Sequence, residues 1–291
     1  MFPVLNIANI VSIPLYGLIF LIGYFIVAFA LRPAAKSHGL QTMDGFCAHL
    51  FAGIGVFIGA KIMYCITVLP TVVPYYTNIS HLPALLSYFK SNPIGFLSTF
   101  LSYCFGGLVF YGGLIGGVLG IVSYCLAFKV PFTPYLEMYA PAIPFMHAFG
   151  RIGCFCAGCC YGIEYHGPFA VTFPYNEYVP ELSEVPRFPV QLTEALLNFI
   201  VAGILFYLYK KRTTKKGVLL GIYVCCYTVA RFLLEFLRGD EIRGGIGSVS
   251  TSQIISILLI PIGIWLVSGG VERLLNRRHQ REYVSTKDAS L

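Results

Sequence analysis

The sequence predicts an all-α membrane protein with about seven transmembrane helices, a small extracytoplasmic head and an interfacial arm. Apolar residues make up 57% of the 291 residues and charged residues only 11%, whereas an ordinary soluble domain carries roughly 25% charged residues. A soluble chain of this length would lack the charge to cover its own surface. The composition therefore excludes a soluble globular enzyme, a disordered chain and a nucleic-acid-binding protein.

A helix that crosses a bilayer needs about 20 mostly apolar residues, and such runs recur along the whole chain. They cover residues 11–31, 45–69, 104–128, 135–160, 191–209, 217–237 and 251–269. The fourth run is the weakest, because Pro141 and Pro144 interrupt it. We expect the first run to be a retained helix, because residues 1–31 contain no Lys or Arg and so lack the positive segment of a signal peptide.

Basic residues gather at alternate ends of these runs, as expected for loops held in the cytoplasm. They lie at Arg32 and Lys36, at Lys129, within 210–216 and in the tail. An odd number of spans then places the N-terminus outside and the C-terminus in the cytoplasm. Within one membrane domain (1–291), we expect 70–103 to form the interfacial arm, 162–190 the extracytoplasmic head or cap, and 271–291 a basic cytoplasmic tail.

Ionisable side chains inside the apolar runs are the main candidates for a site, because a charge at the centre of a membrane helix costs about 2.5–3.5 kcal/mol. They are Lys61, Arg151, Arg231, Glu235 and, where the sixth run ends, Arg238. With Tyr227, the last three are spaced to share one helical face. Arg231 and Glu235 are predicted to pair at i,i+4.

This polar stripe has two interpretations, a contact that joins helices or an inward-facing site. One Glu cannot neutralise Arg151, Arg231 and Arg238, so an apparent excess of guanidinium indicates an anionic ligand. Arginine matches the geometry of phosphate oxygens, and phospholipids are the abundant phosphate carriers of a membrane. His147 lies four residues before Arg151, and it is either a packed residue or a base.

Four of the ten cysteines fall within seven residues. They are Cys154, Cys156, Cys159 and Cys160. Metal ligation, a redox-active pair and a structural role are all open interpretations. A tetrahedral metal site usually draws on two separated pairs, and adjacent cysteines rarely ligate one ion. We therefore predict no metal at this cluster.

Several motifs rich in glycine and arginine follow one another along the chain. They are Tyr16-Gly17, Tyr111-Gly112-Gly113-Leu114-Ile115-Gly116, Gly150-Arg151-Ile152-Gly153 followed by Phe155, Gly158 and Gly162, Arg187-Phe188-Pro189-Val190-Gln191-Leu192-Thr193-Glu194-Ala195, Arg231-Phe232-Leu233-Leu234-Glu235-Phe236-Leu237-Arg238-Gly239-Asp240 and Ser252-Gln253. In this order, the set resembles the signature of the prolipoprotein diacylglyceryl transferases over nearly the whole chain.

The resemblance implies a multi-pass enzyme of the bacterial plasma membrane that needs no cofactor. Such enzymes move the diacylglyceryl group of phosphatidylglycerol to the lipobox cysteine of a prolipoprotein signal peptide, and glycerol phosphate leaves. We assign catalysis to Arg151, Arg231, Tyr111 and Tyr227. We assign substrate binding to Tyr16, Gly112, Gly113, His147, Gly162, Gln191, Glu194, Glu235 and Arg238.

The chain departs from the family pattern at several polar positions. Tyr111 stands where the family has His, Cys154 and Ala157 where it has Asn, Cys159 where it has Glu, and Thr193 where it has Tyr. The identity of the base therefore stays open. A phospholipid-binding or transport protein without transferase activity is the main alternative function, and a thiol-redox protein built on the cysteine cluster is a weaker one.

Overall fold

The structure is a computed structural model that describes most of the chain. The described residues are 4–7, 11–37, 39–77, 82–97, 109–174, 184–211, 215–240, 245–247 and 249–277. They form two compact units, of which the larger joins Met1–Leu40 to Thr133–Leu291 and the smaller is Gln41–Phe132.

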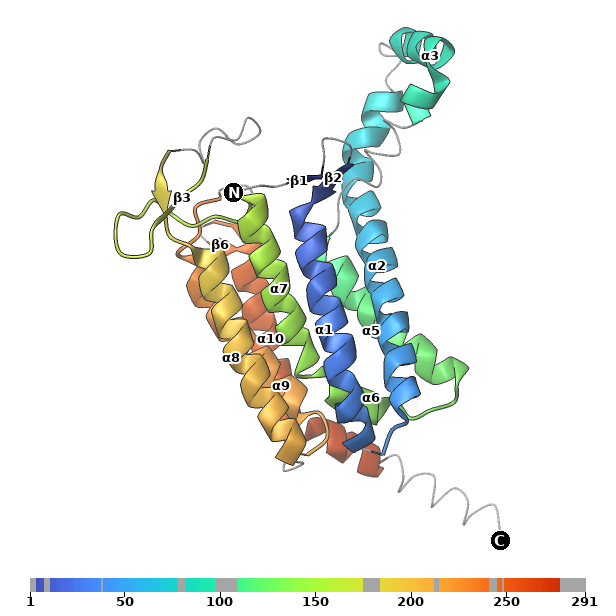
Figure 1. The fold of residues 1–291 in the computed structure, drawn as a ribbon, viewed down its shortest axis with the longest axis vertical. Helices are drawn as coiled ribbons and strands as arrows, with labels where there is room; N and C mark the ends of the chain where they lie inside the picture. The colour runs from blue at the N-terminus through green and yellow to red at the C-terminus, as the bar shows by residue number, and fades with distance from the viewer. Residues whose placement is uncertain are drawn as a thin grey trace. The chain divides into compact units, whose positions relative to one another are not determined.

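The larger unit is a set of helices that pack one against the next. Its helices are α1 (Leu15–Ser37), α7 (Ala142–Ala157), α8 (Val190–Lys211), α9 (Val218–Glu235) and α10 (Thr251–Val267). Helix α1 packs on α7, α7 on α8, α8 on α9 and α9 on α10, as can be followed in Figure 1. The short α6 (Phe132–Tyr139) joins this unit through the Glu137 carboxylate, which accepts a hydrogen bond from the Gly217 amide ahead of α9.

The smaller unit is built on close contact between α2 (Thr42–Thr77) and α5 (Phe110–Ala127). A methyl group added at Gly116 would overlap the Gly55 carbonyl, and one at Gly112 would overlap the Gly59 carbonyl. The two backbones can approach this closely because neither helix has a side chain at these positions. The glycines of the second predicted motif therefore pack helices together, and α3 (Leu82–Ser91) follows α2 within the same unit.

All seven predicted apolar runs contain a helix, but not all of these helices are long enough to count as spans. Among the described residues, four pass by length and composition, namely Leu15–Arg32, Thr42–Thr67, Val190–Lys211 and Val218–Glu235. A fifth would combine Thr251–Val267 with Gly270–Arg277, which are bent by 60°, and two shorter apolar helices cover Gly112–Ala127 and Ala142–Ala157. The chain is thus a multi-pass membrane protein with four or five candidate spans.

Three boundaries differ from the predicted ones. Residues 11–14 form strand β2 (Val11–Pro14), which pairs antiparallel with β1 (Val4–Ile7), so the first helix begins only at Leu15. The fourth run divides into α6 and α7 at Ala140–Pro141, because proline lacks the N–H that a continuous helix requires and is favoured where a new helix begins. Helix α2 continues to Thr77, past the predicted start of the arm at residue 70.

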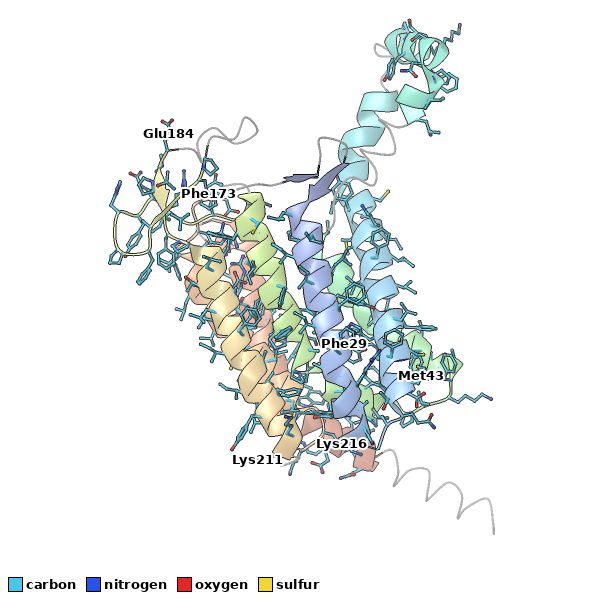
Figure 2. The ribbon with its side chains drawn as sticks, in the orientation of Figure 1. Phe29, Met43, Phe173, Glu184, Lys211 and Lys216 are labelled. Carbon is cyan, nitrogen blue, oxygen red and sulfur yellow. The ribbon has the colours of Figure 1, made fainter. Side chains whose placement is uncertain are left out.

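The outward-facing side chains suit a lipid environment. Phe29 on α1, labelled in Figure 2, is 62% exposed, and other large apolar residues of α1 and α2 are also exposed. In the larger unit, Lys211 and Lys216 lie at the opposite end of the helices from Phe173 and Glu184. The basic cluster and the polar cap are therefore separated by the length of the apolar helices.

The predicted cap contains a short hairpin. Strand β3 (Val171–Thr172) pairs with β4 (Pro186–Arg187), which leads into α8, while residues 175–183 lie outside the described residues. A second short hairpin, β5 (Gly245–Ile246) with β6 (Val249–Ser250), leads into α10. Ser250 begins α10 with a capping box, in which its hydroxyl and the Gln253 side chain satisfy each other's backbone N–H groups.

Candidate functional site

Arg151, His147 and Glu194 form the polar centre of the larger unit. Arg151 and His147 lie one turn apart on α7, and Glu194 comes from the first part of α8. The Arg151 Nε atom is 3.0 Å from the Glu194 Oε1 atom, and the His147 Nε2 atom is 3.6 Å from the same oxygen. The exposed fractions of the Arg151 and Glu194 side chains are only 14% and 3%. One carboxylate therefore contacts both Arg151 and His147 of α7.

Helix α9 completes this centre with two tyrosines. The His147 Nδ1 atom lies 3.2 Å from the Tyr223 hydroxyl, and the His147 ring packs against the Tyr227 ring at 4.9 Å between centroids. Tyr223 and Tyr227 stack one turn apart. Because both ring nitrogens of His147 face polar groups, its orientation is fixed from α8 and α9 together.

Arg231 forms a second buried pair on α9. Its Nη1 atom is 2.8 Å from the Glu235 Oε2 atom, so the predicted i,i+4 ion pair is confirmed. Its Nη2 atom donates to the Ser252 hydroxyl at 2.9 Å. Because the capping box holds the start of α10, this contact also fixes Arg231 against a second helix.

Arg238 does not share the helical face of Arg231 and Glu235, so that part of the prediction is wrong. Helix α9 ends at Glu235, and Arg238 forms a β-bridge with Gly162 of the cap. Its Nε and Nη2 atoms donate to the two carboxylate oxygens of Asp240 at 2.9 and 3.0 Å. Burial alone would lower the pKa of Arg238, but the Asp240 carboxylate outweighs burial and raises that pKa above its ordinary value.

Gly162 lies where the cap meets the end of α9. A side chain there would overlap the Phe188 carbonyl, and the Arg187 guanidinium donates to the Gly162 carbonyl at 3.3 Å. The Arg187 guanidinium also stacks over the Tyr161 ring, at 4.5 Å. Gln191 donates to the Cys159 carbonyl at 2.9 Å. These contacts hold the cap against α8, beside the end of α7.

The three arginines of the site are balanced by carboxylates, which corrects the predicted excess of positive charge. Arg151 pairs with Glu194, Arg231 with Glu235 and Arg238 with Asp240. The sequence argument counted Glu235 alone, because Glu194 and Asp240 approach their arginines only in the folded chain. A guanidinium has five N–H donors, so a carboxylate partner does not use all of its binding capacity.

A small pocket opens between α8 and α9 beside this centre. Its lining residues are Glu194, Leu197, Asn198, Val201, Tyr223, Cys226, Tyr227, Ala230 and Arg231. Polar groups lie at its inner end, whereas Leu197 and Cys226 on its rim are exposed. The pocket therefore joins the buried charges to the apolar surface of the helices.

The remaining predicted site residues fall in different places. Tyr16 begins α1, and its ring packs so closely on Gly153 of α7 that a side chain at Gly153 would meet it at 2.8 Å. Tyr111, Gly112 and Gly113 belong to α5 in the smaller unit. The Tyr111 side chain is outside the described residues, and the role of these three residues at the site stays a prediction.

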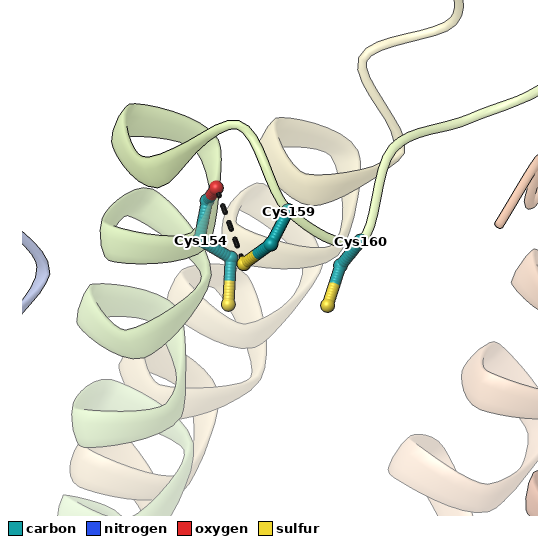
Figure 3. A group of neighbouring side chains, drawn as sticks. All are labelled: Cys154, Cys159 and Cys160. Atoms are coloured by element: carbon teal, nitrogen blue, oxygen red, sulfur yellow. Dashed lines mark hydrogen bonds between the residues drawn. The ribbon is translucent and has the colours of Figure 1, made fainter. Parts of the chain in front are cut away.

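Three of the four clustered cysteines gather at the end of α7. The Sγ atoms of Cys154, Cys159 and Cys160 all lie within 4.8 Å of one another, as Figure 3 shows, and the Cys159 thiol donates to the Cys154 carbonyl at 3.6 Å. The neighbouring Cys154 and Cys160 side chains, and then burial, hold the pKa of Cys159 well above its ordinary value. Cys156 is not part of this thiol group.

The family model for prolipoprotein diacylglyceryl transferase matches residues 3–268. The chain belongs to this family.

Curated relatives are similar over most of their length. A phosphatidylglycerol–prolipoprotein diacylglyceryl transferase of Clostridium tetani is 31% identical over 86% of this chain and 90% of its own. The corresponding protein numbered 2 in Clostridium perfringens is 31% identical over 94% of this chain and 97% of its own. A relative in Geobacter sulfurreducens is 30% identical over 86% of this chain and 87% of its own.

Three residues of this transferase-family site, Tyr223, Ser252 and Asp240, were not predicted with a role. Tyr223 lies one turn before Tyr227, so the spacing of the stripe could have included it. Ser252 was part of a motif, but its contact with Arg231 depends on the packing of α9 against α10. Sequence spacing finds neighbours on one helix, and it does not find partners on another.

Proposed function

We propose that this chain transfers the diacylglyceryl group of phosphatidylglycerol to the lipobox cysteine thiol of a prolipoprotein signal peptide. The observation that carries the proposal is the buried Arg151–Glu194–His147 centre in a membrane protein of this family. Buried charge on membrane helices is costly and marks substrate pathways. The names of the relatives support phosphatidylglycerol as the donor and a prolipoprotein as the acceptor.

The reaction is a substitution at a glyceryl carbon. The acceptor thiol loses its proton, its sulfur forms a C–S bond with that carbon, and the bond from the carbon to the phosphate oxygen breaks. The bonding electrons leave with glycerol phosphate, whose phosphate gains negative charge. Arg151 and Arg231 stabilise this developing charge through N–H groups that their carboxylate partners hold in place.

The charge balance of the site explains how three arginines can remain charged in a low-dielectric environment. Each arginine is already paired before substrate arrives, so little unpaired charge is buried. A phosphate then competes with the carboxylates for guanidinium donors. Arg238 and Gly162 join the end of α9 to the cap, where they bind the donor headgroup.

His147 and Tyr227 act close to the Arg151–Glu194 pair. His147 is held by Tyr223 and Glu194, and Tyr227 packs on its ring. This arrangement positions His147 to take up or relay the thiol proton. Tyr16, Gln191 and Glu235 hold the surrounding elements, and the small pocket between α8 and α9 places Arg231 next to the apolar surface from which the lipid approaches.

We also propose seven spans in the bacterial plasma membrane, with the N-terminus outside and the C-terminus in the cytoplasm. The shorter apolar helices Gly112–Ala127 and Ala142–Ala157 complete the count. The separation of Lys211 and Lys216 from the cap supports a cytoplasmic basic end. The cap at 162–190 and the arm at 70–103 then face the outside, while the tail at 271–291, helical as far as Arg277, lies inside.

A reconstituted transfer assay tests the proposal. The purified chain is incubated with phosphatidylglycerol and a lipobox peptide, and the lipidated peptide is measured by mass spectrometry. We expect product from the wild type and from Arg273→Ala, which lies beyond α10, and none from Arg151→Ala. If the wild type binds phosphatidylglycerol in vesicles but forms no product, the chain is a phospholipid-binding protein instead.

A further inference from the structure

The thiols of Cys154, Cys159 and Cys160 are brought together by the way α7 ends. Gly158 adopts a left-handed conformation (φ 71°, ψ 19°) as the C-cap of the helix, and the Cys159 amide then bonds back to the Cys154 carbonyl at 3.1 Å. Cys160 also has a positive φ of 60°, which is uncommon for a residue other than glycine. The chain therefore turns back over its last helical turn and adds two thiols to that of Cys154 (Figure 3).

The sequence argument predicted no metal at these cysteines, but the resulting geometry suits a single thiophilic metal ion. All three Sγ atoms lie within 4.8 Å of one another. With zinc–sulfur distances of about 2.3 Å, sulfur ligands of a tetrahedral zinc ion lie about 3.8 Å apart. The Sγ atoms therefore need to approach one another by about 1 Å at most to reach that geometry. Thiolates are the ligands that favour Zn²⁺ over harder cations.

Charged and polar groups of the arginine site lie close to the cluster. A Zn²⁺ ion with three thiolates has a net negative charge. Arg151 lies within electrostatic range of Cys154 and Cys160, and Arg238 within that of Cys160. The phenol of Tyr16 lies within electrostatic range of all three cysteines. The cluster therefore lies beside the arginine site and beside Tyr16.

We propose that Cys154, Cys159 and Cys160 bind one Zn²⁺ ion as thiolates and leave its fourth position for the acceptor cysteine of the substrate peptide. Three protein ligands with one open position are typical of catalytic rather than structural zinc sites. This assignment rests on the proposed transferase function for its use of the open position, whereas metal binding itself does not depend on that function.

The chemistry balances without an oxidant or a further reactant. The acceptor thiol coordinates Zn²⁺ and is deprotonated there, and its proton passes to His147, the proton acceptor proposed above. The bound thiolate sulfur then forms the C–S bond as the C–O bond to phosphate breaks, and the electron pair leaves with glycerol phosphate. The thioether product is uncharged and binds zinc more weakly than a thiolate, so it is released and water takes its place.

Metal binding is tested on the full-length protein, purified in detergent under reducing conditions and freed of metal by chelation. We expect one Zn²⁺ per chain by elemental analysis, and a sulfur-to-metal charge-transfer band when Co²⁺ replaces Zn²⁺. Cys154→Ser and Cys159→Ser should each weaken zinc binding by at least ~100-fold. Cys156→Ser is the matched control, because it removes a thiol from the same run but not from the thiol group, and it should bind as the wild type does.

Two results overturn the site itself. One is zinc binding by Cys154→Ser and Cys159→Ser equal to that of Cys156→Ser. The other is a disulfide among the three cysteines, with no zinc, in protein isolated from membranes with its thiols trapped. A native melting temperature for each variant in the absence of metal shows that any loss of binding is not loss of folding.

The open position is tested with the Co²⁺-loaded protein and two lipobox peptides. A peptide with its cysteine should strengthen the charge-transfer band, and the same peptide with serine in its place should not. Equal spectra with both peptides overturn acceptor coordination. Transfer activity is measured separately on metal-loaded and metal-free protein. Full activity without metal overturns the catalytic role of zinc. No activity in either form, with the spectral change intact, rejects the transferase proposal alone.

Discussion

The Nε atom of Arg151 lies 3.0 Å from the Oε1 atom of Glu194, across the packed helices α7 and α8. The same oxygen faces His147 at 3.6 Å. Glu194 therefore sets the position of a cation and of a titratable ring at once. Because Glu194 contacts both residues, a substitution at Glu194 should affect the stability of the protein and its activity together.

We expect Glu194→Gln to lower both the melting temperature and the transfer rate. The substitution keeps the shape of the side chain but leaves Arg151 without its carboxylate. Breaking a buried ion pair in this way costs about 3–5 kcal/mol. Thermal unfolding in detergent and the peptide-lipidation assay measure the two effects. Glu164→Gln is the control, because the Glu164–His166 pair is exposed, and an equal effect of both substitutions would contradict the assigned role.

Arg231→Lys should reduce the transfer rate although the positive charge is kept. A lysine ammonium does not reproduce the planar fork that contacts Glu235 and Ser252 together. Loss of one preorganised donor to a developing charge costs about 10²–10³-fold in kcat. Steady-state kinetics with phosphatidylglycerol vesicles measure this change. Ser252→Ala, which removes a single contact, should have the smaller effect, and a wild-type rate for Arg231→Lys would exclude Arg231 from catalysis.

Asp240→Asn should weaken substrate use through Arg238. The two charge-assisted bonds that orient the guanidinium are reduced to one, because an asparagine side chain has a single acceptor oxygen. Each hydrogen bond to a charged group contributes about 1.5–3 kcal/mol, so we expect kcat/KM to fall by about 10-fold or more. A folded variant with unchanged kcat/KM would show that Arg238 only anchors the cap.

Gly116→Ala should destabilise the smaller unit. The added methyl group overlaps the Gly55 carbonyl of α2, and such overpacking costs about 1–3 kcal/mol. The matched control is Gly203→Ala on α8, where a side chain meets open space and alanine is the better helix former. Thermal unfolding should separate the two variants, and equal melting temperatures would argue against the α2–α5 contact.

Local patterns predicted the helices and one ion pair of this structure. Each apolar run holds a helix, because apolar length needs no information from the rest of the chain. The Arg231–Glu235 pair could be predicted for the same reason, since i,i+4 neighbours meet on any helix. The end of α9 could not be predicted from local spacing. Arg238 and Gly239 lie beyond the helix and form backbone contacts with Gly162 and Tyr161 of the cap region.

The sequence argument named the members of the Arg151 cluster but missed most of their contacts. Arg151, Glu194 and His147 were all named as site residues, and the structure places them together. Their one-to-one charge balance was missed, because a partner on another helix has no fixed sequence spacing. The thiol group was likewise open to several interpretations until the left-handed turn at Gly158 and Cys160 brought its third member into place.

The carboxylate partners of Arg151 and Arg231 also differ in when they are synthesised relative to their arginines. Helix α9 brings Arg231 and Glu235 into the bilayer together, so its charges are compensated from the start. Helix α7 carries Arg151 alone, and Glu194 follows only with α8. A charge without a partner is costly in lipid. We therefore expect α7 to enter the membrane stably as a hairpin with α8, so that truncating the nascent chain before α8 leaves α7 poorly inserted.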